Sequence, residues 1–189
     1  MAELLNRPLT PESINAAWKR LRREHTVWVP GLSRSDMDRD LASHLLSLAD
    51  ELRSGRYRPA PIRQFTISKA DGRKRVLTAL SLRDKLAQRA VLQVLDPLGE
   101  ALFHNDSFGY RRRRNTEMAC RRAAERICCG LGWLVDADIR SFFDEIPHRP
   151  LIKALKRVIP DRDMMRLLES WLAESYSHAG ILTSRRGIA

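Results

Sequence analysis

The sequence predicts an α/β fold of the α+β type, in which helices cover a β-hairpin and the beginning of a second sheet. Three observations support this prediction. Apolar residues recur every three or four positions in several segments, as they do on the buried face of a helix. Two strand-like runs flank Asp71-Gly72, and a third apolar run, Trp133–Asp138, ends in a carboxylate.

The composition describes a folded and basic protein. Its 189 residues suit one domain or two small ones, and a hydrophobic content of 43% is enough to form a core. The 34 Lys and Arg residues outnumber the 23 Asp and Glu residues, which leaves a formal net charge of +11. Such a charge favours a polyanionic partner through counterion release, and nucleic acid is the first candidate. A basic protein without a specific polyanionic partner is the alternative that charge alone leaves open.

Cysteine and histidine usage argues against a zinc site. Cys120, Cys128 and Cys129 do not form a C-x-x-C pair, and the five histidines are scattered singly. The sparse cysteines, together with a first stretch that has no long apolar core, predict a cytoplasmic protein. No apolar stretch approaches the roughly 20 residues that cross a bilayer, so we expect no membrane insertion.

Helix signals appear early in the chain. Thr10, Pro11 and Glu12 read as an N-cap, a first-turn proline and an acidic first turn, and an apolar stripe follows them. A second stripe, Met37–Leu52, follows a serine-rich cap region and stops before Gly55. We therefore expect one short helix after Thr10 and one continuous second helix.

The middle and the end of the chain carry a hairpin signal and further helix signals. The runs Gln64–Lys69 and Arg75–Leu80 predict two strands joined by an Asp-Gly turn. A helix should begin near Arg83, and Asn115 is placed to cap the next one. Two more helices are expected on either side of Pro160, from the stripes Leu151, Leu155, Val158 and Met164, Leu168, Trp171, Leu172.

The run Trp133–Asp138 combines an apolar strand pattern with carboxylates. A strand that ends in Asp138 could present this side chain to a metal ion, and phosphoryl transfer requires such oxygen ligands. Because residues two apart on a strand share a face, Asp136 could join it. A solvated strand end with helix caps is the alternative reading of the acidic cluster that extends to Glu145.

Several short sequence blocks follow one another in an order that is typical of a known protein family. They are a lysine before the Asp-Gly turn, the run RDKLAQRA, the element SFGYR and the segment WLVDADIRSFFDEIPH, within about Gly55 to His148. In this order they resemble the group II intron-like reverse transcriptases of bacteria, a family that includes CRISPR-associated members. The resemblance implies residues 1–58 as an N-terminal helical segment, 59–130 as reverse transcriptase fingers with the β-hairpin, and 131–189 as a partial palm.

The resemblance also implies a catalytic site. It places the catalytic aspartate at Asp138, with the backbone carbonyl of Ile139 as a further ligand of Mg²⁺ and Asp136 in a subsidiary position. Phe143 takes the place of an aromatic ring that presses on the nucleotide sugar and excludes a 2′-hydroxyl, which implies a preference for deoxynucleotides. Core packing is the alternative for Phe142 and Phe143, and Phe142 fits it better.

Cationic residues take the positions that contact nucleotide and template in this family. The resemblance implies nucleotide contacts for Lys69 and Arg75, on opposite strands of the hairpin, and for Arg111. It implies template contacts for Arg63, Arg73, Lys74, Tyr110 and Arg114. The alternative is that the hairpin cations and the run Arg111–Arg114 are ordinary solvated residues. The aromatic residues in SFGYR favour stacking on bases.

The family pattern continues beyond Ala189 into a Gln-Gly pair and a Tyr-x-Asp-Asp hairpin, and no Asp-Asp pair occurs in the 189 residues. We therefore expect the N-terminal half of an RNA-directed DNA polymerase, truncated before the catalytic hairpin and inactive alone. The implied partners are an RNA template, a DNA primer and deoxynucleoside triphosphates, with intron RNA or the CRISPR adaptation proteins Cas1 and Cas2 as further candidates. The alternative is a non-catalytic RNA-binding or assembly module derived from reverse transcriptase fingers.

Overall fold

The computed structural model describes residues 10–24, 26–68, 70, 72–174, 176–178 and 181–183. Its elements are α2 (Pro11–Leu21), α3 (Arg34–Arg39), α4 (Leu41–Arg53), β1 (Ile62–Ser68), β2 (Lys74–Ala79), α5 (Leu82–Leu102), α6 (Thr116–Cys128), α7 (Phe142–Glu145), α8 (His148–Val158), α9 (Arg162–Ala173), β3 (Tyr176–His178) and β4 (Ile181–Thr183). Contacts divide the chain into a larger unit, Met1–Val94 with Ser141–Ala189, and a smaller unit, Leu95–Arg140. The two units are defined by how compact they are, and they do not test the predicted boundaries of the fingers and the palm. Those boundaries stay a prediction.

Local sequence signals set the starts of three helices as predicted. The Thr10 hydroxyl accepts a hydrogen bond from the backbone N–H three residues on, at 3.2 Å, and Pro11 opens α2. Ser33 and Asp36 form a reciprocal capping box at the start of α3. The side chain of Asn115 accepts from the third backbone N–H of α6 at 2.9 Å. These bonds satisfy donors that a helix start leaves unpaired.

The prediction of one continuous helix over Met37–Leu52 is wrong, because the chain leaves the helical conformation at Asp40. Its φ of −135° and ψ of 51° end α3 and begin α4. Aspartate is a poor residue for a helix interior and a favoured one at a helix start, which explains the position of the break. The apolar stripe nevertheless continues across it, since Met37, Leu48 and Leu52 are all buried.

The predicted hairpin is confirmed and belongs to a four-stranded sheet of order β2-β1-β3-β4. β1 and β2 pair in antiparallel fashion, with Ile67 opposite Arg75 and Ser68 opposite Lys74. Gly72 has a φ of +78°, the left-handed conformation that the predicted turn requires. The short strands β3 and β4, which the sequence did not predict, add to the free side of β1 with β3 parallel to it.

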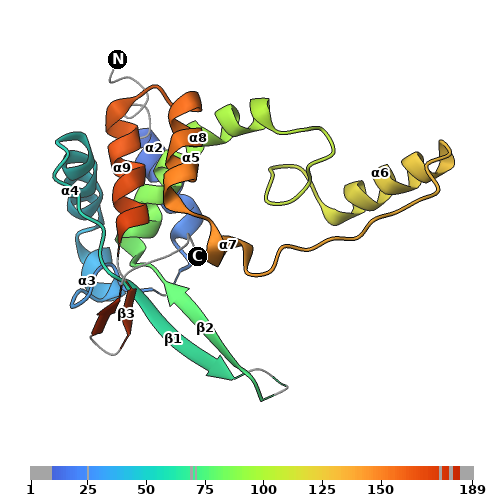
Figure 1. The fold of residues 1–189 in the computed structure, drawn as a ribbon. Coiled ribbons are helices and arrows are strands. Elements are labelled where there is room, and N and C mark those ends of the chain that lie inside the picture. The colour runs from blue at the N-terminus through green and yellow to red at the C-terminus, as the bar shows by residue number, and fades with distance from the viewer. Residues whose placement is uncertain are drawn as a thin grey trace. The chain divides into compact units, whose positions relative to one another are not determined.

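The larger unit contains the hydrophobic core. Figure 1 shows α2, α4, α5 and α9 gathered into a helical layer, with β1 and β2 extending away from it. Its fully buried side chains come from these helices and α3, and the largest apolar ones are Ile14, Met37, Leu48, Leu82, Leu86, Val91 and Met164. None of the described helices combines the length and the apolar character needed to span a bilayer.

A buried carboxylate connects the parts of this core. Asp84, near the start of α5, accepts hydrogen bonds from the Tyr57 hydroxyl at 2.6 Å, the Ser81 hydroxyl at 2.7 Å and the Ala60 backbone N–H at 3.0 Å. The indole N–H of Trp171, on α9, donates to the Tyr57 hydroxyl at 3.1 Å. Burial, and then the charge of Asp84, raise the pKa of Tyr57 well above its ordinary range, so the phenol stays a donor.

Arginine completes the network on its outer side. Arg83 forms an ion pair with Glu51 on α4 and donates to the backbone carbonyl of Arg58 at 3.0 Å. Its guanidinium also lies over the Tyr57 ring, 4.7 Å from the ring centroid. Side chains from α4, α5, α9 and the segment before β1 therefore share one polar cluster, which fixes where the hairpin leaves the helices.

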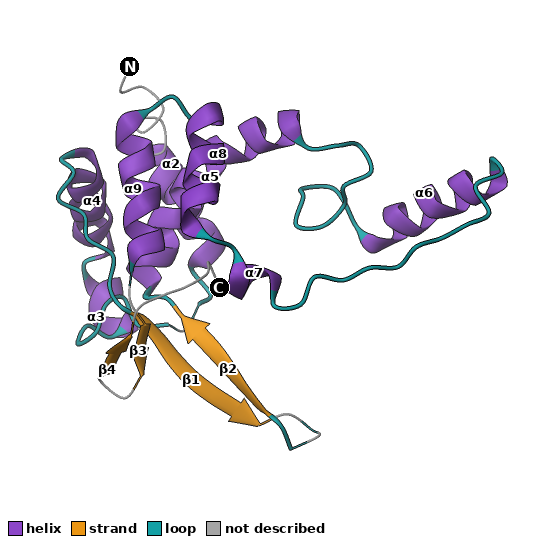
Figure 2. Cartoon of the chain, in the orientation of Figure 1, coloured by secondary structure: helices purple, strands orange, loops and turns teal. Residues whose placement is uncertain are grey.

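The smaller unit is organised differently, because no apolar side chain among its described residues is buried. The prediction of a strand over Trp133–Asp138 is wrong for this structure: residues 131–139 form no helix or strand and are exposed, as the loop colour in Figure 2 shows. A strand needs a neighbouring strand to pair its backbone N–H and C=O groups. None of the described strands pairs with this segment.

Replacing Asp84 tests whether the polar cluster supports the fold. Asp84→Ala should lower the free energy of unfolding by about 3 kcal/mol or more, because two buried hydroxyls and a half-buried backbone N–H lose a charged acceptor. Asp50→Ala, which removes an exposed carboxylate paired with Arg56, should cost less than about 1 kcal/mol. Denaturant unfolding of both variants measures the difference, and equal costs would contradict the structural role of Asp84.

Candidate nucleic-acid interface

The hairpin presents cations together with exposed apolar side chains. Residues directly opposite on antiparallel strands share a face, so Arg75 lies on the face of Ile67, Phe65 and Arg63. Phe65 is 43% exposed and Ile67 is 42% exposed, which leaves their surfaces available to a ligand. A face with an aromatic ring between cations can bind phosphates and stack on a base.

The other predicted hairpin residues surround this face. Lys74 is exposed on the opposite face of β2, and Arg73 is exposed between the turn and β2. Among the described residues, no carboxylate lies within ion-pair distance of Arg63, Lys74 or Arg75. Lys69 lies outside the described residues. The hairpin therefore carries three cations whose charge is not compensated by a described neighbour.

Residues 103–115, the arginine loop, contain the SFGYR element, and Arg111 holds its first half together. The Arg111 guanidinium pairs with Glu100 on α5 at 2.7 Å and donates to the carbonyls of His104 and Ser107 at 2.8 and 2.9 Å. Only 5% of the Arg111 side chain is exposed. Its donors are directed to the protein, so the structure gives Arg111 a positioning contact in place of an open nucleotide contact.

The next arginines are also engaged within the smaller unit. Arg112 pairs with Asp96 on α5 at 2.9 Å. Arg114 donates to the carbonyl of Asn105 at 3.1 Å and lies over the Phe108 ring, 5.4 Å from the centroid. These contacts were not predicted from the sequence, although Asp96 and Glu100, four residues apart on the preceding helix, were a signal of ion pairs with the arginines.

A second set of ion pairs joins the arginine loop to α6. Asp106 pairs with Arg122 and with Arg126, each at 2.7 Å. The hydrogen bond from Arg122, followed by the positive charges nearby, lowers the pKa of Asp106. The hydrogen bond from Arg111 likewise lowers the pKa of Glu100. Ion pairs therefore hold the described part of the smaller unit together, whereas apolar packing holds the larger unit together.

Two residues of the arginine loop project from it. Tyr110 and Arg113 both have a positive φ, 56° and 57°, which is uncommon for residues other than glycine. Tyr110 is 97% exposed, so its ring is accessible for stacking. Arg113, which was not among the predicted site residues, is exposed and forms no ion pair with a described residue. The loop geometry thus leaves one ring and one guanidinium facing solvent.

The predicted catalytic residues belong to two different units. Asp136, Asp138 and Ile139 lie on the exposed segment of the smaller unit, whereas Phe143 lies on α7 of the larger unit. The chain turns between them at Ser141, which has the left-handed φ of 48° and ψ of 41°. The rings of Phe142 and Phe143 lie 5.5 Å apart by their centroids, and both are more than two-fifths exposed.

The donor set in the described residues is too small for a complete metal site. Mg²⁺ takes near-octahedral oxygen coordination and is held by carboxylates together with water or phosphate oxygens. In the described part of the chain, no three His, Cys, Asp or Glu side chains gather closely enough to hold an ion. Asp138 offers one exposed carboxylate, which fits one ligand position of such a site.

Comparison with known proteins decides the family. Residues 67–188 match the family model described as "Reverse transcriptase (RNA-dependent DNA polymerase)". The chain belongs to the reverse transcriptase family. Reverse transcriptases generally use divalent metal ions.

Similar proteins and solved structures are longer than this chain. Protein YkfC of Escherichia coli is 36% identical over 161 residues, which cover 83% of this chain and 42% of that protein. The group II intron-encoded protein LtrA of Lactococcus lactis is 29% identical, over 89% of this chain and 28% of its own length. A solved partial Cas6-RT-Cas1–Cas2 complex shares the fold with a TM-score of 0.62 at 23% identity, over 97% of this chain and 31% of that one. The chain thus spans less than half the length of these relatives.

Arg111→Gln should loosen the arginine loop, because it removes both the pair with Glu100 and the bonds to two carbonyls. We expect faster hydrogen exchange at the backbone amides of residues 103–112, measured by mass spectrometry. Arg113→Gln is the matched control, since it removes one arginine of the same run that has no described partner. Equal exchange in the two variants would show that Arg111 does not hold the loop.

Acid should release the same ion pairs. Because the folded-state pKa values of Glu100 and Asp106 are lowered, their pairs stabilise the loop above the ordinary carboxyl range and lose this effect as pH falls below it. NMR signals of the Arg111 and Arg122 Nε–H groups should therefore move as pH falls below the ordinary carboxyl range. Signals that stay constant during this fall in pH would contradict the pairing.

Proposed function

We propose that this chain forms the fingers and the first part of the palm of an RNA-directed DNA polymerase that adds deoxynucleotides to a primer. The observation that carries the proposal is the family match over residues 67–188. The confirmed hairpin supports it, since uncompensated cations beside an exposed aromatic ring suit a polyanionic ligand with bases. In this proposal residues 1–58 precede the fingers, residues 59–130 form them, and residues 131–189 begin the palm.

The proposed ligand contacts are those that the resemblance implies, changed at Arg111 and Arg113 in view of their surroundings. Arg75 and Lys69 would contact the triphosphate of the incoming nucleotide, where positive charge offsets the charge that develops during transfer. The template contacts would come from the hairpin and the arginine loop, through Arg63, Arg73, Lys74, Tyr110 and Arg114. We add Arg113 to this set because it is exposed. Arg111 would position the loop, since its donors are engaged inside the protein.

The proposed metal is Mg²⁺, held by Asp138 and the backbone carbonyl of Ile139 together with carboxylates beyond the described residues. Such an ion supplies Lewis-acid stabilisation of the phosphate oxygens when it is bound. Phe143 would contact the sugar of the nucleotide and disfavour a 2′-hydroxyl. Asp136 lies two residues before Asp138 and would have a subsidiary role.

The relatives indicate the candidate partners. LtrA is a group II intron-encoded protein, and the structural neighbour is part of a Cas6-RT-Cas1–Cas2 complex. We propose an RNA template, a DNA primer and deoxynucleoside triphosphates as ligands of the complete polymerase. Intron RNA and the adaptation proteins Cas1 and Cas2 are the further candidates, and the two contexts differ in what the protein would assemble with.

Asp138→Ala should abolish synthesis in a form of the protein that continues past Ala189. Loss of a metal ligand removes several kcal/mol of transition-state stabilisation, which corresponds to at least about a hundredfold slower primer extension. Asp136→Ala is the matched control and should retain most activity, because it removes a neighbouring carboxylate of the same segment. Primer extension on an RNA template with Mg²⁺ measures both variants.

Two outcomes would contradict this proposal. Unchanged function of the Asp138→Ala variant, with retained RNA binding, would favour the non-catalytic RNA-binding or assembly module. Mg²⁺-dependent extension by the 189-residue chain alone would show that no further carboxylates are needed. We expect extension by this chain to be negligible for the reason that its described residues hold no complete metal site.

A further inference from the structure

Helix α8 carries a regular row of cations that the proposed polymerase site does not use. Arg149, Lys153 and Arg157 follow one another at intervals of four residues. Residues four apart lie on the same side of a helix, and a rise of 1.5 Å per residue separates them by about 6 Å along its axis. The three side chains therefore form one row, inclined to the helix axis, along one side of α8, and we call this row the α8 ridge.

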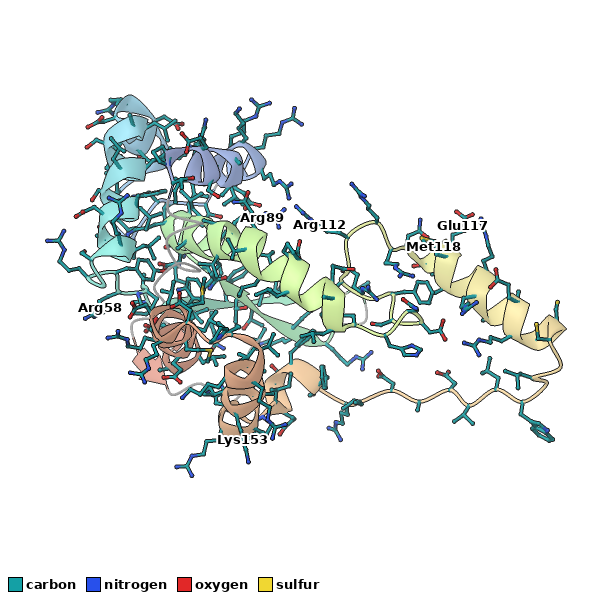
Figure 3. The ribbon with its side chains drawn as sticks, turned by 90° about the horizontal axis from the view of Figure 1, so that it is seen from above. Arg58, Arg89, Arg112, Glu117, Met118 and Lys153 are labelled. Carbon is teal, nitrogen blue, oxygen red and sulfur yellow. The ribbon has the colours of Figure 1, made fainter. Side chains whose placement is uncertain are left out.

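The charge of the α8 ridge is not compensated by its surroundings. All three residues are exposed, and Lys153 points away from the ribbon in Figure 3. Among the described residues, no carboxylate forms an ion pair with any of them, whereas the neighbouring Lys156 pairs with Glu169 on α9 at 2.8 Å. The 11 residues of α8 include no Asp or Glu. Such a row repels itself, and a negatively charged ligand would relieve the repulsion.

Packing fixes the direction of the ridge. Leu151, Leu155 and Val158 are half-buried and lie on the side of α8 opposite to the cations. α8 packs against α9, with the pair between Lys156 and Glu169 at the flank of this contact. The helix cannot turn its ridge inward without exposing the apolar stripe, so the cations are held towards solvent.

We propose that the α8 ridge binds the phosphate backbone of a double-helical nucleic acid, through residues other than those of the hairpin and the arginine loop. Cations at regular steps of about 6 Å can each meet a different phosphate along one strand. The ridge offers no aromatic ring for stacking and no acceptor for a base edge, so it would bind without sequence preference. It differs from a membrane-surface helix because its apolar side packs against α9.

The inference goes beyond the proposed synthesis, since it assigns a contact outside the template and nucleotide sites. A polymerase with such a ridge would hold a folded region of its nucleic acid while the hairpin acts elsewhere on the ligand. The phosphate backbone could come from RNA or from DNA, and the experiment below includes both. The outcome of the primer-extension experiment does not affect this inference, because binding by the α8 ridge needs no nucleotide and no metal ion.

Salt-dependent binding tests the ridge. The triple variant Arg149→Gln, Lys153→Gln, Arg157→Gln is compared with the unchanged 189-residue chain on an RNA hairpin stem and on a DNA duplex of the same sequence. Loss of three phosphate contacts should reduce the slope of log K against log salt by about 2 to 3. The matched control, Arg20→Gln, Arg23→Gln, Arg53→Gln, removes the same charge from exposed arginines of α2, of the residues that follow it and of α4, and should reduce the slope by less than about 1.

The outcomes distinguish binding by the α8 ridge from binding that depends only on the net positive charge of the chain. A larger loss of slope in the ridge variant than in the control, on either nucleic acid, supports the proposal, and the better-bound duplex identifies the source of the phosphates. Equal losses in the two variants would overturn it. The variant Arg149→Lys, Arg157→Lys keeps the charge and should keep the slope, so a loss of 2 or more in this variant would also overturn it. Circular dichroism verifies that each variant retains its helices.

Discussion

The buried carboxylate of Asp84 is the interaction on which the larger unit depends. A charge that is removed from water is costly unless hydrogen bonds surround it, and here two hydroxyls and a backbone N–H do so. The donors belong to the segment before β1 and to the residues before α5, and Trp171 extends the network to α9. The exit angle of the hairpin is therefore tied to the packing of the helices. A rigid base of this kind lets two exposed strands present Arg63 and Arg75 in a fixed register.

Different interactions stabilise the two units. Apolar burial holds the larger unit, whereas ion pairs of Asp96, Glu100 and Asp106 with arginines hold the described part of the smaller one. Ion pairs near the surface contribute less stability than a core and respond to pH and salt. The segment that contains Asp138 thus belongs to the unit whose described residues include no buried apolar side chain. Within the proposed function, a catalytic carboxylate on such a segment requires further strands to position it.

Sequence signals that act over a few residues predicted much of the fold. The caps at Thr10, Ser33 and Asn115, the Asp-Gly hairpin and the amphipathic helices each need only local chemistry, and the structure contains them. Features that depend on distant partners were missed, namely the short strands β3 and β4 beside β1 and the contacts of Arg111 with α5. The break at Asp40 was missed because the apolar stripe continues across it. Of the candidate site, the resemblance placed cations on an exposed hairpin. The strand predicted at Trp133–Asp138 is not formed, because this segment has no pairing partner among the described strands.

The central claim is that the segment Trp133–Asp138 becomes a palm strand, and Asp138 a metal ligand, once further strands pair with it. Hydrogen exchange of the backbone amides of residues 133–139 tests this most directly, in the 189-residue chain and in a form that continues past Ala189. We predict fast exchange in the chain and strong protection in the longer form, because pairing shields the amides. Equally fast exchange in both forms would contradict the claim.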